Sequence, residues 1–326
     1  MNLKISLSAL NHHKEENETM SSNLIDKIQQ LKKEKRALIL AHNYQRPEVQ
    51  DIADFVGDSL ELSLCATQTE AKVIVFCGVD FMAETAAILN PDKRVLIPDK
   101  NALCPMAAML PGELVQLYRK KYPNAKVVLY INTLAEAKAS CDAVCTSANS
   151  AEIVDRMDSE TVLFGPDWNL AHYVKGYTKK RVVPIPKLGF CPVHILFNKE
   201  TILRMKETHP DAEVLAHPEC TPEVCGIADF VGSTSKMYGR ALVSKTKKFI
   251  VATEVGLLHR MRKGRGDATF IPAYEEAVCV NMKLHTLEKL YLSLKHERYR
   301  VNVPPKIMAS ARNAVEVMLG TRENLA

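Results

Sequence analysis

The sequence predicts an α/β protein of three similar domains, each a three-layer α/β/α unit with a short parallel sheet, related by a pseudo-threefold axis. The first observation is a repeat: ADFVGDS, CDAVCTS and ADFVGSTS begin at Ala53, Cys141 and Ala228, which are 88 and then 87 residues apart. The second is the alternation of helical and strand patterns within each period. A period of this size exceeds a solenoid repeat and suits a small domain.

Three further sets of residues keep the same step, so a chance repeat is very improbable. They are Tyr44, Asn132 and Glu219 in the motifs AHNYQ, YINT and AHPEC; Phe76, Phe164 and Val251 at the starts of FCG, FGP and VAT; and Cys104, Cys191 and Cys279. The period divides the chain into an N-terminal extension (1–21), three domains (22–110, 111–197 and 198–284) and a C-terminal helical segment (285–326).

The first domain alternates helices with strands. Helices are predicted in SSNLIDKIQQLKKEKR, which has a candidate Ser cap, in PEVQDIADF with Pro47 in its first turn, and in SLELSLCATQTEA and FMAETAAILN. The short apolar runs ALILA, FVG, KVIVFCG and RVLIPD are expected to be buried parallel strands. Polar motifs follow the strands, which is where open parallel sheets bind ligands.

The other two domains repeat this order. The second has helical patterns in ELVQLYRKKYP, AEAKAS and WNLAHYV, and strands in AKVVLYI, DAVCTS, TVLFG and RVVPIP. The third has helical patterns in KETHP and VGLLHRM, and strands in AEVLA, ADFVGS, KKFIVAT and, least clearly, DATFIPA. Two last helices, LHTLEKLYLSLKHE and PPKIMASARNAVEVMLG, are expected to pack back on the domains.

Composition limits the classes of function. The chain of 326 residues is 47% hydrophobic and 25% charged, with a net charge of +5, as in ordinary globular proteins. Its short basic clusters are typical of solvent-exposed faces, so nucleic acid is not expected as a partner. No apolar run reaches the roughly 18 residues of a membrane span, so no membrane partner is expected. Nine cysteines, an odd number without an export signal, predict a cytoplasmic location.

One cysteine in each domain takes the same place after a strand, in IPDKNALC, IPKLGFC and EEAVC: Cys104, Cys191 and Cys279. A packing position would tolerate Ala, Val or Ser, so a thiol in all three copies indicates chemistry. Three soft thiolates about one axis fit an iron–sulfur cluster or a zinc site. Since no fourth cysteine is periodic, a cubane held here leaves one iron open as a Lewis acid.

The remaining cysteines lack this support. Cys77 and Cys145 align with Gly or Ala in the other domains and are expected in the core. The spacings Cys141–Cys145 and Cys220–Cys225 resemble metal sites but do not repeat, so they are not predicted to be ligands.

A set of hydroxyls, Ser59, Ser147 and Thr234, also keeps the period, each after a strand and before a helix. One interpretation is that they are helix N-caps. The other is that hydroxyls and nearby amides form a seat for a carboxylate or phosphate near the axis. The two roles are compatible, and three hydroxyls from three domains favour the anion site.

The last periodic residues have diverged into different polar types, as expected when a symmetric pocket binds an asymmetric substrate. They are His42, Tyr130 and His217 at one position, and Tyr44, Asn132 and Glu219 at the other. Glu219, the only carboxylate, is the first candidate for proton transfer, and Tyr44 and His217 come next. His194, three residues after Cys191, either lines the same pocket or is structural.

Many ordered blocks resemble the quinolinate synthase (NadA) family. They are AHNYQ, VQDIADFVGDSLELS, CGVDFMAETAAILNP, LYINTLAEAKASCDAVCTSAN, GFCPVH, HPECTPEVCGIADFVGSTSKM, VATEVGLLHRM and CVNMKLHTLEKLYLSL. The resemblance runs from about Leu38 to Leu294. Some relatives place the last cysteine in a CxxCxxC run, whereas Cys279 stands alone here.

The resemblance implies an enzyme that condenses iminoaspartate with dihydroxyacetone phosphate to quinolinate, releasing phosphate and two waters, in NAD biosynthesis. It implies an oxygen-sensitive 4Fe-4S cluster on Cys104, Cys191 and Cys279, and an L-aspartate oxidase or dehydrogenase as supplier of the imine. It makes Tyr44 a mobile phenol of the active site. The implied substrate contacts are His42, Ser59, Tyr130, Asn132, Ser147, His217, Glu219 and Thr234.

Two rival interpretations stay open. A radical-type iron–sulfur enzyme of similar build, such as the diphthamide synthase family, also has one cysteine per domain, although the HPE and YIN blocks argue against it. The other is a non-catalytic protein stabilised by zinc. Broad visible absorption of anaerobically purified protein distinguishes iron–sulfur from zinc.

Overall fold

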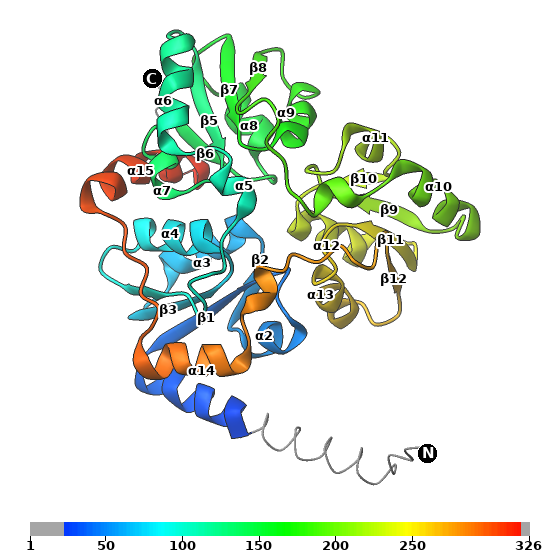
Figure 1. Ribbon diagram of the computed structural model, residues 1–326. Coiled ribbons are helices and arrows are strands. Elements are labelled where there is room, and N and C mark those ends of the chain that lie inside the picture. The colour runs from blue at the N-terminus through cyan, green and yellow to red at the C-terminus, as the bar shows by residue number, and fades with distance from the viewer. Residues whose placement is uncertain (1–22, 321–326) are drawn as a thin grey trace, which may run out of the picture.

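The computed structural model describes residues 23–320. The proposed extension (1–21) and the candidate Ser cap of the first helix lie outside this range. Within it, each predicted repeat contains one parallel four-stranded sheet, and the three sheets have equivalent strand orders: β2-β1-β3-β4, β6-β5-β7-β8 and β10-β9-β11-β12. The predicted α/β fold with three repeated sheets is confirmed, and Figure 1 shows the sheets arranged about a common centre.

Every predicted strand is present, including the weak one in DATFIPA. The first sheet contains β1 (Ala37–His42), β2 (Phe55–Gly57), β3 (Val73–Cys77) and β4 (Arg94–Leu96). The second contains β5 (Lys126–Tyr130), β6 (Ala143–Cys145), β7 (Thr161–Gly165) and β8 (Arg181–Pro184). The third contains β9 (Glu213–Ala216), β10 (Phe230–Val231), β11 (Lys248–Ala252) and β12 (Thr269–Pro272).

Helices connect these strands and cover the sheets. The first domain has a helix over 23–34, α2 (Pro47–Ile52), α3 (Ser59–Gln68), α4 (Asp80–Leu89) and α5 (Pro105–Ala108). The second has α6 (Gly112–Lys121), α7 (Ala135–Lys138), α8 (Ser150–Asp155), α9 (Trp168–Lys175) and the 3-10 turn η1 (His194–Leu196). The third has α10 (Lys199–Thr208), α11 (Pro222–Cys225), α12 (Thr234–Val243), α13 (Leu257–Gly264) and the turn η2 (Met282–Leu284). No helix within the described part of the chain is long and apolar enough to cross a membrane.

Each sheet is buried on both faces because its strands are apolar at successive positions. In β1, Ile39 and Ala41 contribute to one core while Leu40 contributes to another. The first of these cores also contains Leu290 of α14 (Leu287–His296). This alternation of side chains on a strand gives each domain its three layers.

The first two domains share a hydrophobic core, whereas the third has cores of its own. The shared core contains Phe81 of α4, Phe164 of β7 and Val315 of α15 (Pro305–Met318). Helix α15 packs against β6, α7 and α4, so the C-terminal segment joins the first domain to the second, as Figure 1 shows. The expectation that the last two helices pack back on the domains is confirmed.

Candidate active site

A cavity of about 200 Å³ lies where loops from the three domains meet. These loops follow the carboxyl ends of the strands, where an open parallel sheet places its ligand-binding residues. The cavity brings together every site residue predicted from the sequence: His42, Tyr44, Ser59, Cys104, Tyr130, Asn132, Ser147, Cys191, His194, His217, Glu219, Thr234 and Cys279. The repeat period therefore identified side chains that lie in one cavity although some of them are more than 200 residues apart in the sequence.

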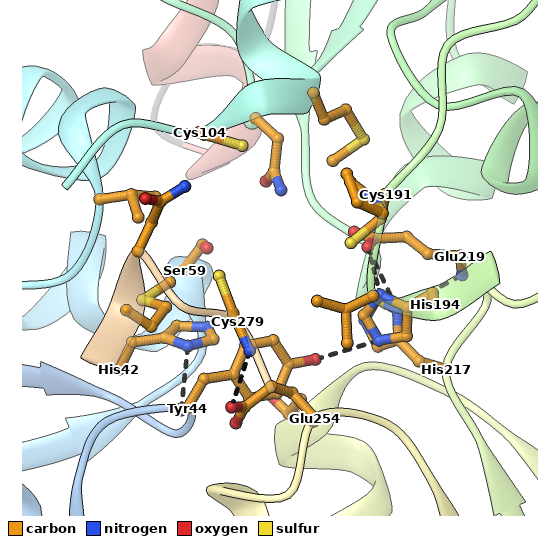
Figure 2. Close-up of a pocket in the computed structure, with 18 of the residues that line it drawn as sticks. His42, Tyr44, Ser59, Cys104, Cys191, His194, His217, Glu219, Glu254 and Cys279 are labelled. Atoms are coloured by element: carbon orange, nitrogen blue, oxygen red, sulfur yellow. Dashed lines mark hydrogen bonds and ion pairs between the residues drawn. The ribbon is translucent and has the colours of Figure 1, made fainter. Parts of the chain in front are cut away.

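The three periodic cysteines surround the same space, as Figure 2 shows. Each begins a turn whose backbone amides donate to its sulfur: Ala107 to Cys104, Val193 and His194 to Cys191, and Asn281 and Met282 to Cys279. Burial nevertheless raises the pKa of all three thiols above the usual value. A bound cation would offset that desolvation, so three partly buried thiols with oriented amides fit a metal centre.

All nine cysteines are free, and the other six do not line the cavity. Cys77 and Cys145 are fully buried in the sheets, which confirms the expectation that they pack in the core. The sulfurs of Cys220 and Cys225 are directed at backbone carbonyls of the third domain. A further set of potential metal ligands is Cys191, His194 and Glu219, whose ligand atoms lie within 4.8 Å of one another.

Glu219 is buried in a cluster of polar side chains from two domains. The Tyr130 hydroxyl donates a 2.6 Å hydrogen bond to Oε1, and Nδ1 of His194 lies 2.7 Å from Oε2. Burial acts to raise the pKa of Glu219, but His194, His217 and the hydrogen bonds outweigh it and hold the pKa below the usual value. Glu219 is therefore an ionised carboxylate at neutral pH.

His42 and His217 have the same local geometry. Nδ1 of His42 accepts the backbone N–H of Tyr44 at 3.2 Å, and Nδ1 of His217 accepts that of Glu219 at 3.3 Å. A neutral ring with Nδ1 as acceptor carries its proton on Nε2. Burial lowers the pKa of both rings to about 3. Both are thus neutral hydrogen-bond donors near pH 7.

Tyr44 is connected to Glu219 through two other side chains. Its hydroxyl lies 2.7 Å from Oγ1 of Thr253, which in turn lies 2.9 Å from Nε2 of His194. The ring of His194 also stacks on that of His217, with 4.6 Å between the ring centroids. His194 is 1% exposed, and these contacts place it in the pocket rather than in a separate structural role.

The three periodic hydroxyls are not helix N-caps, so this interpretation was wrong. Asp58 caps α3 by accepting the amides of Leu60 and Glu61, and Ser233 caps α12. The N-cap position of α8 is Asn149. Ser59 and Thr234 are instead the first helical residues, where a side chain does not close the first turn.

One amide side chain, Asn132, lines the cavity, and another, Asn43, bonds a residue that does. Asn43 donates a 2.8 Å hydrogen bond from Nδ2 to Oγ1 of Thr234, and so connects the first and third domains. The Oδ1 atom of Asn132 is buried without a hydrogen-bond partner among residues 23–320. Since a buried polar atom is rarely left unpaired, this atom is available to a ligand.

The sequence analysis missed Asp58, Thr253 and Glu254. Asp58 and Glu254 line the cavity, and Thr253 bonds Tyr44 and His194. A signal was present for Glu254, because it stands 87 residues after Asp167. Asp167 in turn stands 87 residues after Asp80, so an acid recurs at this step in all three domains.

Comparison with known proteins gives the same family as the sequence motifs. The chain matches the family described as Quinolinate synthetase A protein (NadA) over residues 26–320. The quinolinate synthase of Methanothermobacter thermautotrophicus is 55% identical over 297 residues, which cover 91% of this chain and 97% of that protein. Those of Pyrococcus horikoshii and Thermotoga maritima are 52% and 48% identical, covering 91% and 90% of this chain and 98% and 97% of theirs. With its family match spanning nearly all the described residues, the chain belongs to the quinolinate synthetase A family.

Proposed function

We propose that this protein is a quinolinate synthase that condenses iminoaspartate with dihydroxyacetone phosphate to quinolinate, phosphate and two waters, as a step of NAD biosynthesis. The observation that carries the proposal is the single cavity between three repeated sheets. It contains one cysteine from each domain together with all the predicted substrate contacts. The relatives named quinolinate synthase, which match along nearly their whole length, support the same activity.

We propose that Cys104, Cys191 and Cys279 hold a 4Fe-4S cluster. When bound, the cluster supplies a Lewis-acidic iron that favours loss of hydroxide from the substrate. The set of Cys191, His194 and Glu219 fits this chemistry less well as the resident site, because it leaves two cavity thiols unused. His194 and Glu219 also already contact each other, Thr253 and Tyr130.

The neutral side chains of the cavity are suited to binding carboxylates and phosphate. Iminoaspartate has two carboxylates, and dihydroxyacetone phosphate has a phosphate. The hydroxyls of Ser59, Ser147 and Thr234 can donate to such oxygens, as can the Nε2–H groups of His42 and His217. Two amides of the first turn of α3 are occupied by Asp58, so near Ser59 the hydroxyl provides the contact.

Proton transfer is assigned to the cluster of residues around Glu219. Its carboxylate accepts from Tyr130, and the contacts through His194 and Thr253 connect it to Tyr44. Such a chain can move a proton between Glu219 and Tyr44, the first and second candidates for acid–base catalysis. His217, whose ring stacks on that of His194, stays a candidate next to Tyr44, and its neutral ring can donate a hydrogen bond from Nε2 near pH 7.

From the family resemblance and the repeat period we also propose domain boundaries, a cellular location with a type of enzyme, and a supplier of the imine. The domain boundaries are set at 22–110, 111–197 and 198–284, with one sheet in each range. The enzyme works in the cytoplasm as a transferase-type condensing dehydratase. An L-aspartate oxidase or dehydrogenase supplies the imine.

An anaerobic assay with both substrates tests the proposal. Protein purified without oxygen should be brown, contain iron and sulfide, and form quinolinate and phosphate in equal amounts. The matched control is Cys191→Ala purified in the same way. Colourless, iron-free parent protein, or brown protein that forms no quinolinate from the two substrates, would contradict it.

A further inference from the structure

Three acidic residues, one in each domain, keep the repeat period and contact the cysteines that line the cavity. Asp80, Asp167 and Glu254 are 87 and 87 residues apart. In each domain the acid accepts a hydrogen bond from the backbone N–H of the cavity cysteine. The distances are 3.0 Å from Cys104 to Oδ1 of Asp80, 3.1 Å from Cys191 to Oδ2 of Asp167 and 3.1 Å from Cys279 to Oε1 of Glu254.

We propose that Asp80, Asp167 and Glu254 are positioning residues that fix the three cysteine loops before any metal group binds. Each acid follows the third strand of its domain, whereas the cysteine follows the fourth. The hydrogen bond therefore ties the cysteine loop to the neighbouring strand. This inference rests on the proposed function, in which these cysteines are the metal ligands.

Each acid also accepts a hydrogen bond from a backbone amide that follows it closely in the sequence. Asp80 accepts the amide of Phe81, Asp167 that of Leu170 at the start of α9, and Glu254 that of Gly256. A hydrogen bond in a buried site is electrostatically stronger than one in water. Asp167 and Glu254 are 0% exposed, so their bonds are shielded from water. The anchored acid can then determine where the cysteine backbone lies.

A periodic acid is not in itself evidence for a role at the cysteines, because another periodic set of acids stabilises the fold. Asp54, Asp142 and Asp229 each accept an N–H of a central strand, from Ile39, Val127 and Val214 respectively. They are partly exposed and pair with Lys32, Arg119 and Lys206. None of the three lines the cavity. They are therefore matched controls, equal in period and in bonding to backbone but outside the cavity and bonded to strand residues instead of the cavity cysteines.

The three acids use their oxygens differently, which makes the proposal sharply testable. In Asp80, a single atom, Oδ1, accepts both Phe81 and Cys104. In Asp167, Oδ1 accepts Leu170 and Oδ2 accepts Cys191. In Glu254, Oε2 accepts Gly256, and Oε1 accepts Cys279 and lies 2.9 Å from Nζ of Lys283. Changing the carboxylate to an amide replaces one oxygen by a donor, so both bonds can survive at Asp80, whereas Asp167→Asn and Glu254→Gln each lose either the bond to the cysteine or the anchoring bond.

The experiment compares Asp80→Asn, Asp167→Asn and Glu254→Gln with the control Asp142→Asn. In metal-free protein, hydrogen exchange of the Cys191 or the Leu170 amide should become at least about tenfold faster in Asp167→Asn, as should that of the Cys279 or the Gly256 amide in Glu254→Gln. Exchange of Cys104 in Asp80→Asn, and of all three cysteine amides in the control, should stay within about twofold of the parent. In metal-loaded protein, Asp167→Asn and Glu254→Gln should release iron to a chelator faster and show an altered visible spectrum.

Each outcome shows whether or not the three acids position the cysteine loops. Parent-like exchange at both amides that each acid accepts, Cys191 with Leu170 and Cys279 with Gly256, together with parent-like iron release would overturn the proposal. If Asp167→Asn and Glu254→Gln do not fold, the pair Asp80→Ala and Asp80→Asn repeats the test at Cys104, where only Ala should accelerate exchange. If the parent holds no iron, the proposed metal centre fails, yet the exchange comparison in metal-free protein still decides whether the acids position the cysteines.

Discussion

The hydroxyl of Tyr130 donates a 2.6 Å hydrogen bond to Glu219 across the boundary between the second and third sheets. Tyr130 ends β5, and Glu219 follows β9. The pair therefore places an ionised carboxylate at a junction of two domains, where an isolated domain could not stabilise it. Its contacts with His194 extend this junction into the cavity.

Replacing Glu219 by Gln should leave folding and metal content intact but slow turnover by at least about a hundredfold, because loss of a general acid or base typically costs 10²–10⁴ in rate. A Gln carbonyl can still accept from Tyr130, so the change removes mainly the charge and the base. Glu213→Gln, at the start of the same strand β9, is the control and should retain its turnover. A Glu219→Gln enzyme within a few-fold of the parent would move proton transfer to Tyr44 or His217.

Single Ala substitutions of Cys104, Cys191 and Cys279 should each abolish or strongly reduce bound iron, because a cluster loses one of its three protein ligands. Iron and sulfide analysis of anaerobically purified protein measures this. Cys225→Ala and Cys145→Ala should keep the parent's iron content, since neither residue lines the cavity. Full iron retention in Cys191→Ala would exclude the proposed ligand set.

Ser147→Ala should raise the KM for substrate by roughly ten- to a hundredfold, with iron content unchanged, because a hydrogen bond to a charged group contributes about 1.5–3 kcal/mol. Steady-state kinetics with each substrate varied in turn identifies which anion contacts this hydroxyl. Asn198→Ala, which removes the cap of α10 at a residue that does not line the cavity, is the control: it should lower stability and leave KM unchanged. An unchanged KM in Ala variants of all three hydroxyls would contradict an anion site there.

The stability of metal-free protein should fall as the pH drops from about 6.5 towards 3, in part through His42 and His217. Burial lowers both pKa values from 6.5 to about 3, so in this window the unfolded chain binds protons that the folded chain does not. Each ring then contributes up to about 1.4 kcal/mol per pH unit to the loss of stability. Denaturant unfolding at pH 7 and pH 5 should show a smaller loss for His42→Asn than for the parent. An equal loss would mean that His42 is already protonated in the folded protein at pH 5.

The sequence predicted the architecture because its period could be measured on several independent sets of residues. The strand in DATFIPA was the weakest by pattern, yet it appears at β12 because the neighbouring strand β11 fixes its place in the sheet. The interpretation of the hydroxyls as helix caps was wrong by one residue at Ser59 and Thr234 and by two at Ser147. Asp58 and Ser233 precede the hydroxyls in the chain, and only backbone geometry decides which of two adjacent polar residues closes the turn.

Within the site, the period located most lining residues, including positions whose residue types differ between the domains, but Glu254 and Thr253 were not predicted. Glu254 keeps the step of Asp80 and Asp167, and its longer side chain reaches the equivalent backbone amide. Thr253 aligns with no hydroxyl in the other domains, since Gly78 and Pro166 stand there. Its contacts with Tyr44 and His194 arise from the docking of domains, which a repeat within one chain does not reveal.

The covalent linkage of three similar sheets in one chain has an evolutionary consequence. In a symmetric trimer of identical subunits, every substitution appears three times around the axis, so a His introduced for one ligand atom also confronts the other two. Here each copy mutates by itself. A tyrosine at Tyr130 can therefore coexist with histidines at His42 and His217, while cysteines persist in all three copies. Because the copies are linked in one chain, the cysteines can stay the same in all three domains while the substrate contacts differ between them.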